Sequence, residues 1–145
     1  MIQLTAYKAY FEGLRSYVAG LRQVQVVNVE QDMSDTLRNM RTADLPCLFV
    51  VVPSIHEQPG DADSVSEQLR CLVFLMDRSD RQRRTPLQVL EETQPVIESV
   101  KSFMRAERAR GCSFMRGLGP MTTMPETGFY TDFCGWSVSF TLETD

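Results

Sequence analysis

The chain has 145 residues, of which 43% are hydrophobic, and its formal net charge is -4 at pH 7. A chain of this length suits a single domain, which we expect to cover residues 1–145, and this hydrophobic fraction is too high for a disordered protein. The acidic balance argues against general binding to nucleic acid or to an anionic membrane surface.

The apolar segments are too short to cross a membrane. No unbroken apolar run is longer than Leu48–Val52, which directly follows Cys47, whereas a membrane-spanning helix needs roughly 20 apolar residues. The first residues also lack the basic start and apolar stretch of a signal peptide. We therefore expect a cytoplasmic protein with no membrane partner.

The four cysteines, Cys47, Cys71, Cys112 and Cys134, are far apart in the sequence. The Cys-x-x-Cys spacing of many zinc sites and redox centres is absent. Each cysteine lies within or beside an apolar run, so we expect four reduced thiols that pack as small core residues, with no metal and no other cofactor. A metal site assembled mainly from cysteines of several strands is the alternative.

The first part of the chain predicts one long helix, two strands and a short helical turn. Apolar residues at steps of three and four predict a helix over 2–21. The valine-rich segment 23–31 predicts a strand, and 34–41 predicts the helical turn. The segment 45–53 is apolar at nearly every position, which is typical of a strand covered on both faces, and we expect Pro53 to end it.

A second long strand is predicted after a polar loop. The segment 54–66 is rich in Pro, Gly, Asp and Ser, which predicts the loop. The mostly apolar segment 67–78 predicts the strand, which would form a hairpin with the strand at 45–53. A charged run, DRSDRQRR, then extends to residue 84.

The second main helix has the clearest start signal in the chain. Thr85 is a good N-cap, Pro86 suits the first helical position, and Gln88 completes a capping box. Pro95 is expected to kink this helix or to delay its start. Gly111 suits the position just after the last turn.

The remaining segments predict two strands separated by a loop. A short strand is predicted over 112–118, a loop over 119–128, and a final strand whose alternate residues from Trp136 to Leu142 are apolar. This order of elements predicts an α+β fold, with an antiparallel or mixed β-sheet packed on one side by two main helices. The residues expected to be buried together are Val50, Leu72, Phe74, Leu90, Trp136 and Phe140.

The residue types needed for catalysis do not form a recognisable pattern. His56 is the only histidine and lies in a polar segment without a nucleophile motif. Asp61, Asp63 and Glu67 lack the spacing of a calcium loop, and the glycines form no phosphate-binding motif. We therefore expect a protein that is not an enzyme.

Two oppositely charged segments are candidate interaction sites. The segment 57–67 is acidic, whereas 78–84 is rich in arginine. A solvated surface explains both, but complementary charges also suit head-to-tail association of identical subunits. Nucleic-acid binding is disfavoured because no aromatic residues alternate with the arginines. The candidate residues, with the two methionines that would add apolar contact, are Asp61, Asp63, Glu67, Arg78, Arg81, Arg83, Arg84, Met121 and Met124.

Four segments in order, AYKAYFEGLRSYV, LPCLFVVVP with QLRCLVFLM, TPLQVLEETQPVIESVKSFM and FYTDFCGWSVSFTLET, cover most of the chain. This succession resembles that of phage tail-terminator and tail-completion proteins, although the stretch 23–44 departs from it. The resemblance implies a structural protein of a phage or prophage tail, a homo-oligomeric ring that caps the tail tube. Its partners would be further copies of itself and other tail or connector proteins. The alternative is a small ligand-binding or regulatory α+β domain.

Overall fold

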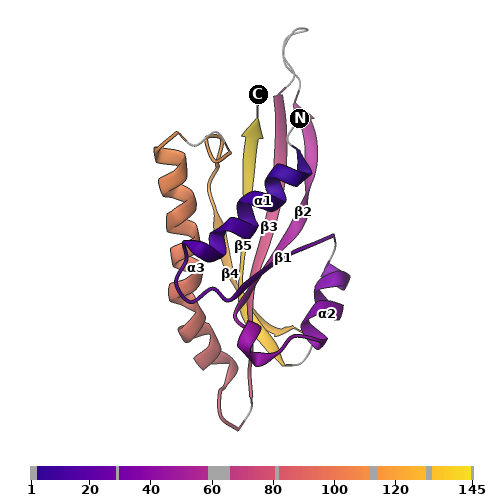
Figure 1. Cartoon of the computed structure of the whole chain (residues 1–145), viewed down its shortest axis with the longest axis vertical. Coiled ribbons are helices and arrows are strands. Elements are labelled where there is room, and N and C mark those ends of the chain that lie inside the picture. Colours follow the sequence, from indigo (N-terminus) through magenta and orange to yellow (C-terminus); the bar gives the residue numbers. More distant parts are fainter. Residues whose placement is uncertain are drawn as a thin grey trace.

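The computed structural model describes residues 3–28, 30–58, 66–80, 82–111, 114–129 and 132–144. The prediction of an α+β fold is confirmed (Figure 1). The elements, in chain order, are α1 (Leu4–Gly13), the 3-10 turn η1 (Leu14–Ser16), β1 (Gln23–Val27), α2 (Glu30–Arg38), the 3-10 turn η2 (Thr42–Asp44), β2 (Cys47–Gln58), β3 (Ser66–Arg78), α3 (Pro86–Ala109), β4 (Thr122–Phe129) and β5 (Phe133–Thr144).

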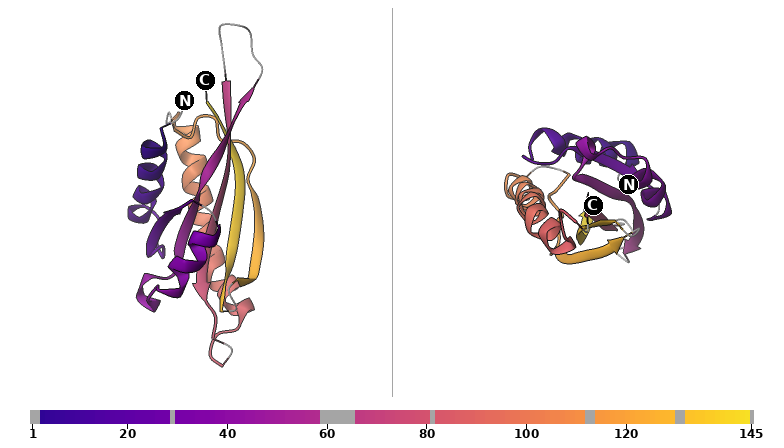
Figure 2. Two further views of the ribbon diagram at one scale, coloured as in Figure 1. Left: turned by 90° about the vertical axis from the view of Figure 1, so that its right-hand side faces the viewer. Right: turned by 90° about the horizontal axis from the view of Figure 1, so that it is seen from below.

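The described strands form a five-stranded mixed sheet in the order β1-β2-β3-β5-β4. β1 pairs with β2 in parallel, and the other neighbouring strands are antiparallel. The predicted hairpin is present as β2 and β3, which pair from Cys47↔Met76 to Gln58↔Ser66. The sheet is strongly twisted (Figure 2).

One face of the sheet is covered by α1 and α3, so the predicted packing of two main helices on one side is confirmed. Phe11 of α1 and Ile97 of α3 are fully buried against strand residues such as Val50 and Phe140. The alternation predicted for the last strand is also present, because Val138, Phe140 and Leu142 all face this core. We call this side the helix face.

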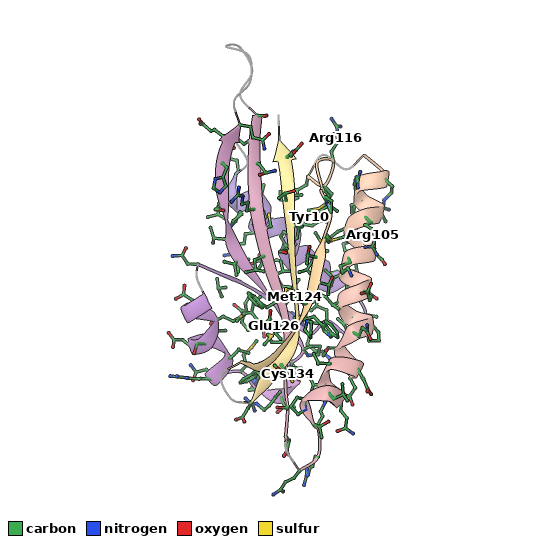
Figure 3. All side chains as sticks on the ribbon, turned by 180° about the vertical axis from the view of Figure 1, so that it is seen from behind. Tyr10, Arg105, Arg116, Met124, Glu126 and Cys134 are labelled. Carbon is green, nitrogen blue, oxygen red and sulfur yellow. The ribbon has the colours of Figure 1, made fainter. Side chains whose placement is uncertain are left out.

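A second core on the opposite face corrects the predicted set of buried residues. Phe74 packs there with Met33 and Leu37 of α2, and Leu72 lies at its edge, whereas Val50, Trp136 and Phe140 belong to the helix face. Successive strand residues point to opposite faces, so one predicted core was divided between two sides. Leu90 is only half-buried. We call this second side the open face, because α2 covers only part of it (Figure 3).

Two prolines lie inside strands, where the sequence predicted a strand end and a loop. β2 continues past Pro53 to Gln58, with a register shift between Val51 and Ser54. β1 pairs only as far as Val51, so Pro53 lies on a free edge at a bulge, where its missing N–H costs no ladder bond. The predicted loop at 119–128 is mostly β4, an edge strand that tolerates Pro125 for the same reason.

Other predicted boundaries were also wrong. The strand predicted over 23–31 is β1, which ends at Val27. The first helix is shorter than predicted, because α1 ends at Gly13 and the chain continues through a 3-10 turn that still buries Leu14. The helical turn predicted over 34–41 is the longer helix α2, which begins at Glu30. The described part of the strand predicted over 112–118 is mostly turn, and only Leu118 forms a bridge, to Leu142.

The start of α3 is confirmed in detail. Thr85 Oγ1 accepts a hydrogen bond from the Gln88 backbone N–H, and the Thr85 backbone N–H donates to the Gln88 side chain. The helix begins at Pro86 and continues through Pro95, so its start is not delayed to Thr93. Gly111 follows the last turn with a φ of 74°, as its predicted position requires.

Candidate functional site

The two candidate charged segments lie at opposite ends of β3. This strand has 13 residues, so it separates its ends by about 40 Å. Ser66 starts it at the acidic end, and Arg78 ends it beside the arginine-rich turn. The described residues of the two segments therefore lie far apart within one subunit.

At the acidic end, described carboxylates come from three neighbouring strands. Glu57 lies directly opposite Glu67 in the β2–β3 ladder, and Glu143 of β5 pairs with Gln68. Glu57 and Glu143 are exposed, and neither forms an ion pair with another described residue. The candidate residues Asp61 and Asp63 lie outside the described residues.

At the arginine end, Arg84 is engaged within its own subunit. Its Nη2 lies 3.1 Å from Asp77 Oδ2 and also contacts Glu92 Oε2. Burial by itself lowers the pKa of Arg84, and the two carboxylates outweigh this effect, so the pKa is raised. Asp77 is 6% exposed and also accepts the backbone N–H of Arg78. This cluster fixes the turn between β3 and α3 and leaves Arg84 little freedom to bind a partner.

The other arginines of this segment differ in availability. Arg78 is half-buried, with its guanidinium 5.2 Å from the centre of the Phe133 ring, and it donates to the Met40 carbonyl. Arg83 is exposed, and its side chain makes no hydrogen bond or ion pair with another described residue. Arg81 lies outside the described residues. Arg83 is therefore the most available described arginine of this segment.

The two candidate methionines have different environments. Met121 is half-buried and packs against the helix-face core, whereas Met124 on β4 is 56% exposed. The sequence predicted that both methionines lie in one loop. Instead, Met124 lies within strand β4, and Met121 directly precedes this strand. Figure 3 shows Met124 on the open face, near Glu126.

Exposed apolar side chains that the sequence analysis did not select lie at both ends of the hairpin. Leu4 and Ile55 are 51% and 45% exposed and help to line a small hollow of about 90 Å³, and Ile55 lies two residues before Glu57 on β2. At the arginine end, Leu87 in the first turn of α3 is 64% exposed. In a helix or strand pattern these residues look like ordinary core positions, so only the fold reveals their exposure.

The residue types that the sequence offered for catalysis remain scattered. His56 is exposed on β2, and its Nε2 lies 3.3 Å from Ser54 Oγ. In the described part of the chain, no group of three or more His, Cys, Asp or Glu side chains could hold a metal ion. Cys47, Cys71 and Cys134 are buried free thiols, as predicted, and Cys112 lies outside the described residues.

A polar hollow on the open face was missed by sequence reasoning. It has a volume of about 300 Å³ and combines Arg70 of β3 with hydroxyl groups of β4 and β5. Its complete lining is Arg70, Cys71, Pro120, Thr122, Ser139, Phe140 and Thr141. These residues come from segments that are distant in the sequence, and the only local signal was the run of polar residues that alternates with the apolar ones in β5.

Comparisons with known proteins add no relationship. No family model matches the chain, and a search of curated proteins finds no match. Among the residues that the structure describes, no helix is both long and apolar enough to cross a membrane.

Proposed function

We propose that this chain is a structural assembly protein of a phage or prophage tail, a terminator or connector whose copies join head to tail in a ring. The observation that carries the proposal is the placement of exposed acidic and basic side chains at opposite ends of one rigid hairpin. Glu57 and Arg83 are too far apart to interact within a subunit, because electrostatic screening acts over about 8 Å at physiological salt. They can form a pair only between two subunits.

Charge alone is insufficient for this contact. An exposed ion pair contributes only about 0–1 kcal/mol, so apolar burial must supply most of the affinity. Leu87 lies four residues after Arg83, and Ile55 of the hollow lies two residues before Glu57 on the same strand. If Leu87 of one copy enters the hollow of the next copy, Arg83 of the first copy comes close to Glu57 of the second. Such a contact is heterologous, and it closes into a ring where the rotation between copies permits.

The complementary charges around Glu57 and Arg83 are local, and they do not make the whole molecule an electrostatic dipole. The last turn of α3, which contains Arg108, lies towards the same end of the molecule as the end of β2 and the start of β3 (Figure 1). Both ends of the molecule therefore carry both signs of charge. Local complementarity sets the register and the choice of neighbour, while apolar contact sets the strength.

The molar mass in solution tests this proposal. At low salt we expect a species larger than the monomer that dissociates as salt is raised. Arg83→Glu should weaken the association, whereas Arg15→Glu changes the net charge equally at an exposed site in η1, outside both ends of the proposed contact, and should leave it unchanged. Leu87→Ser should weaken it at every salt concentration. A chain that stays monomeric at high concentration and low salt would contradict self-assembly.

A further inference from the structure

The polar hollow around Arg70 gathers unused hydrogen-bonding groups on one face of three adjacent strands. Arg70 pairs with Thr141, and Thr122 pairs with Ser139, so these side chains share the open face. Arg70, Thr122 and Ser139 are exposed, and Thr141 is half-buried. Their side chains make no hydrogen bond or ion pair with other described residues. Figure 3 views this face with α1 behind the sheet.

The rim of the hollow is held in place by backbone contacts. The Gly119 N–H donates to the Thr141 carbonyl at 2.9 Å, and the Glu143 N–H donates to the Gly117 carbonyl at 3.0 Å. A Cβ atom at Gly119 would lie only 2.6 Å from Thr141 Oγ1. The segment before β4 therefore packs closely on β5, and the backbone that carries Thr141 is fixed before any ligand arrives, which reduces the entropic cost of binding.

We propose that this hollow binds a small oxyanion, a phosphate or carboxylate group. Arg70 would supply the positive charge and the planar pair of N–H donors that such groups accept. The hydroxyls of Thr122, Ser139 and Thr141 would donate further hydrogen bonds. No carboxylate is among the residues that line the hollow, so a bound anion meets no negative charge within it.

Glu143 is the nearby group that opposes such a ligand. It lies two residues after Thr141 on the same strand face, diagonal to Arg70 across the ladder. Its Oε atoms lie beyond ion-pair distance of the Arg70 guanidinium, so Arg70 stays available. Removing the charge of Glu143 should tighten anion binding, because a repulsion across a few ångströms of solvated surface disappears.

Titration with inorganic phosphate at constant ionic strength, followed by calorimetry and by backbone amide NMR shifts, tests the inference. We expect saturable binding, with the shifts centred on residues near Arg70 and Thr141. Arg70→Gln should weaken binding at least about tenfold, because a hydrogen bond to a charged group is lost. The matched control Arg15→Gln removes the same charge at an exposed position in η1 and should bind as the wild type does. Glu143→Gln should bind about threefold more tightly.

Two further measurements distinguish phosphate from carboxylate ligands and check that the Arg70→Gln variant is folded. Saturable binding of acetate at the same residues assigns the site to carboxylates as well, whereas binding of phosphate alone assigns it to phosphate groups. Binding without saturation, an unchanged affinity in Arg70→Gln, or an equal loss in Arg15→Gln would overturn the inference. Because Arg70 is exposed, its variant should keep the wild-type circular dichroism. The titration is independent of the assembly proposal, since it is read at a salt concentration where the chain is monomeric.

Discussion

Gly135 lies where β5 packs most closely against β3. A Cβ atom at this position would lie 1.7 Å from the Leu75 carbonyl oxygen, a contact that neither backbone can relieve without shifting. Gly13, at the end of α1, has open space around the same atom. Gly135→Ala should therefore lower the free energy of unfolding by about 3 kcal/mol. Gly13→Ala should be neutral or stabilising by up to about 1 kcal/mol. Equal denaturant midpoints for the two variants would show that β3 and β5 are misaligned.

Phe140 tests the helix-face core directly. Its side chain is 4% exposed, and its ring centre lies 6.4 Å from that of Phe11. Phe140→Ala should cost about 3–5 kcal/mol, because it leaves a cavity between β5 and α1. Ser139→Ala changes the exposed neighbour on the other face and should alter stability little. Urea unfolding of both variants measures the difference, and an unchanged midpoint for Phe140→Ala would contradict the assigned orientation of β5.

The buried thiols should be nearly inert in the folded chain. Burial raises the pKa of Cys47, Cys71 and Cys134, that of Cys71 to about 11. Because the thiolate is the reactive form, a thiol reagent at pH 8 should modify these three slowly, and faster as the pH approaches 11. In denaturant all four cysteines of the sequence should react. Fewer reactive thiols without reductant, or stoichiometric zinc in the purified protein, would contradict four reduced, metal-free cysteines.

At the scale of elements, the capping box of α3 is a local signal that the fold preserves. Thr85→Ala removes the acceptor for the Gln88 N–H and should cost about 1 kcal/mol. Thr85→Ser keeps the hydroxyl and should retain most of that stability. Thermal unfolding of the two variants makes the comparison. If both lose the same stability, the methyl group of Thr85, and not the cap, is what matters.

Local chemistry predicted most elements but not where strands continue past prolines. A capping box or a valine-rich run acts within a few residues, so α3, β1 and β3 could be predicted from the sequence. Whether Pro53 or Pro125 ends a strand depends on whether its edge is paired, and only the order of the strands decides this. Likewise, Phe114 looks like a strand residue, but it lies in a turn and stacks on Tyr10, with ring centres 4.8 Å apart.

At the scale of the whole molecule, the candidate sites depend on distances that no local pattern contains. The sequence separated acidic from basic segments, and β3 holds the two apart. The sequence did not predict that Arg84 forms ion pairs with Asp77 and Glu92 of its own subunit, because this ion cluster forms only when the turn packs against α3. The hollow around Arg70 was missed for the same reason, since its hydroxyl groups come together only through strand pairing.

Charge exchange between the two ends tests the central claim most directly. Glu57→Arg and Arg83→Glu should each weaken self-association at low salt, because each places like charges across the proposed contact. The double variant Glu57→Arg/Arg83→Glu restores opposite charges with the signs exchanged. Measured by analytical ultracentrifugation, it should recover the wild-type assembly and its sensitivity to salt. A double variant that associates no better than the weaker single variant would show that Glu57 and Arg83 do not meet between subunits.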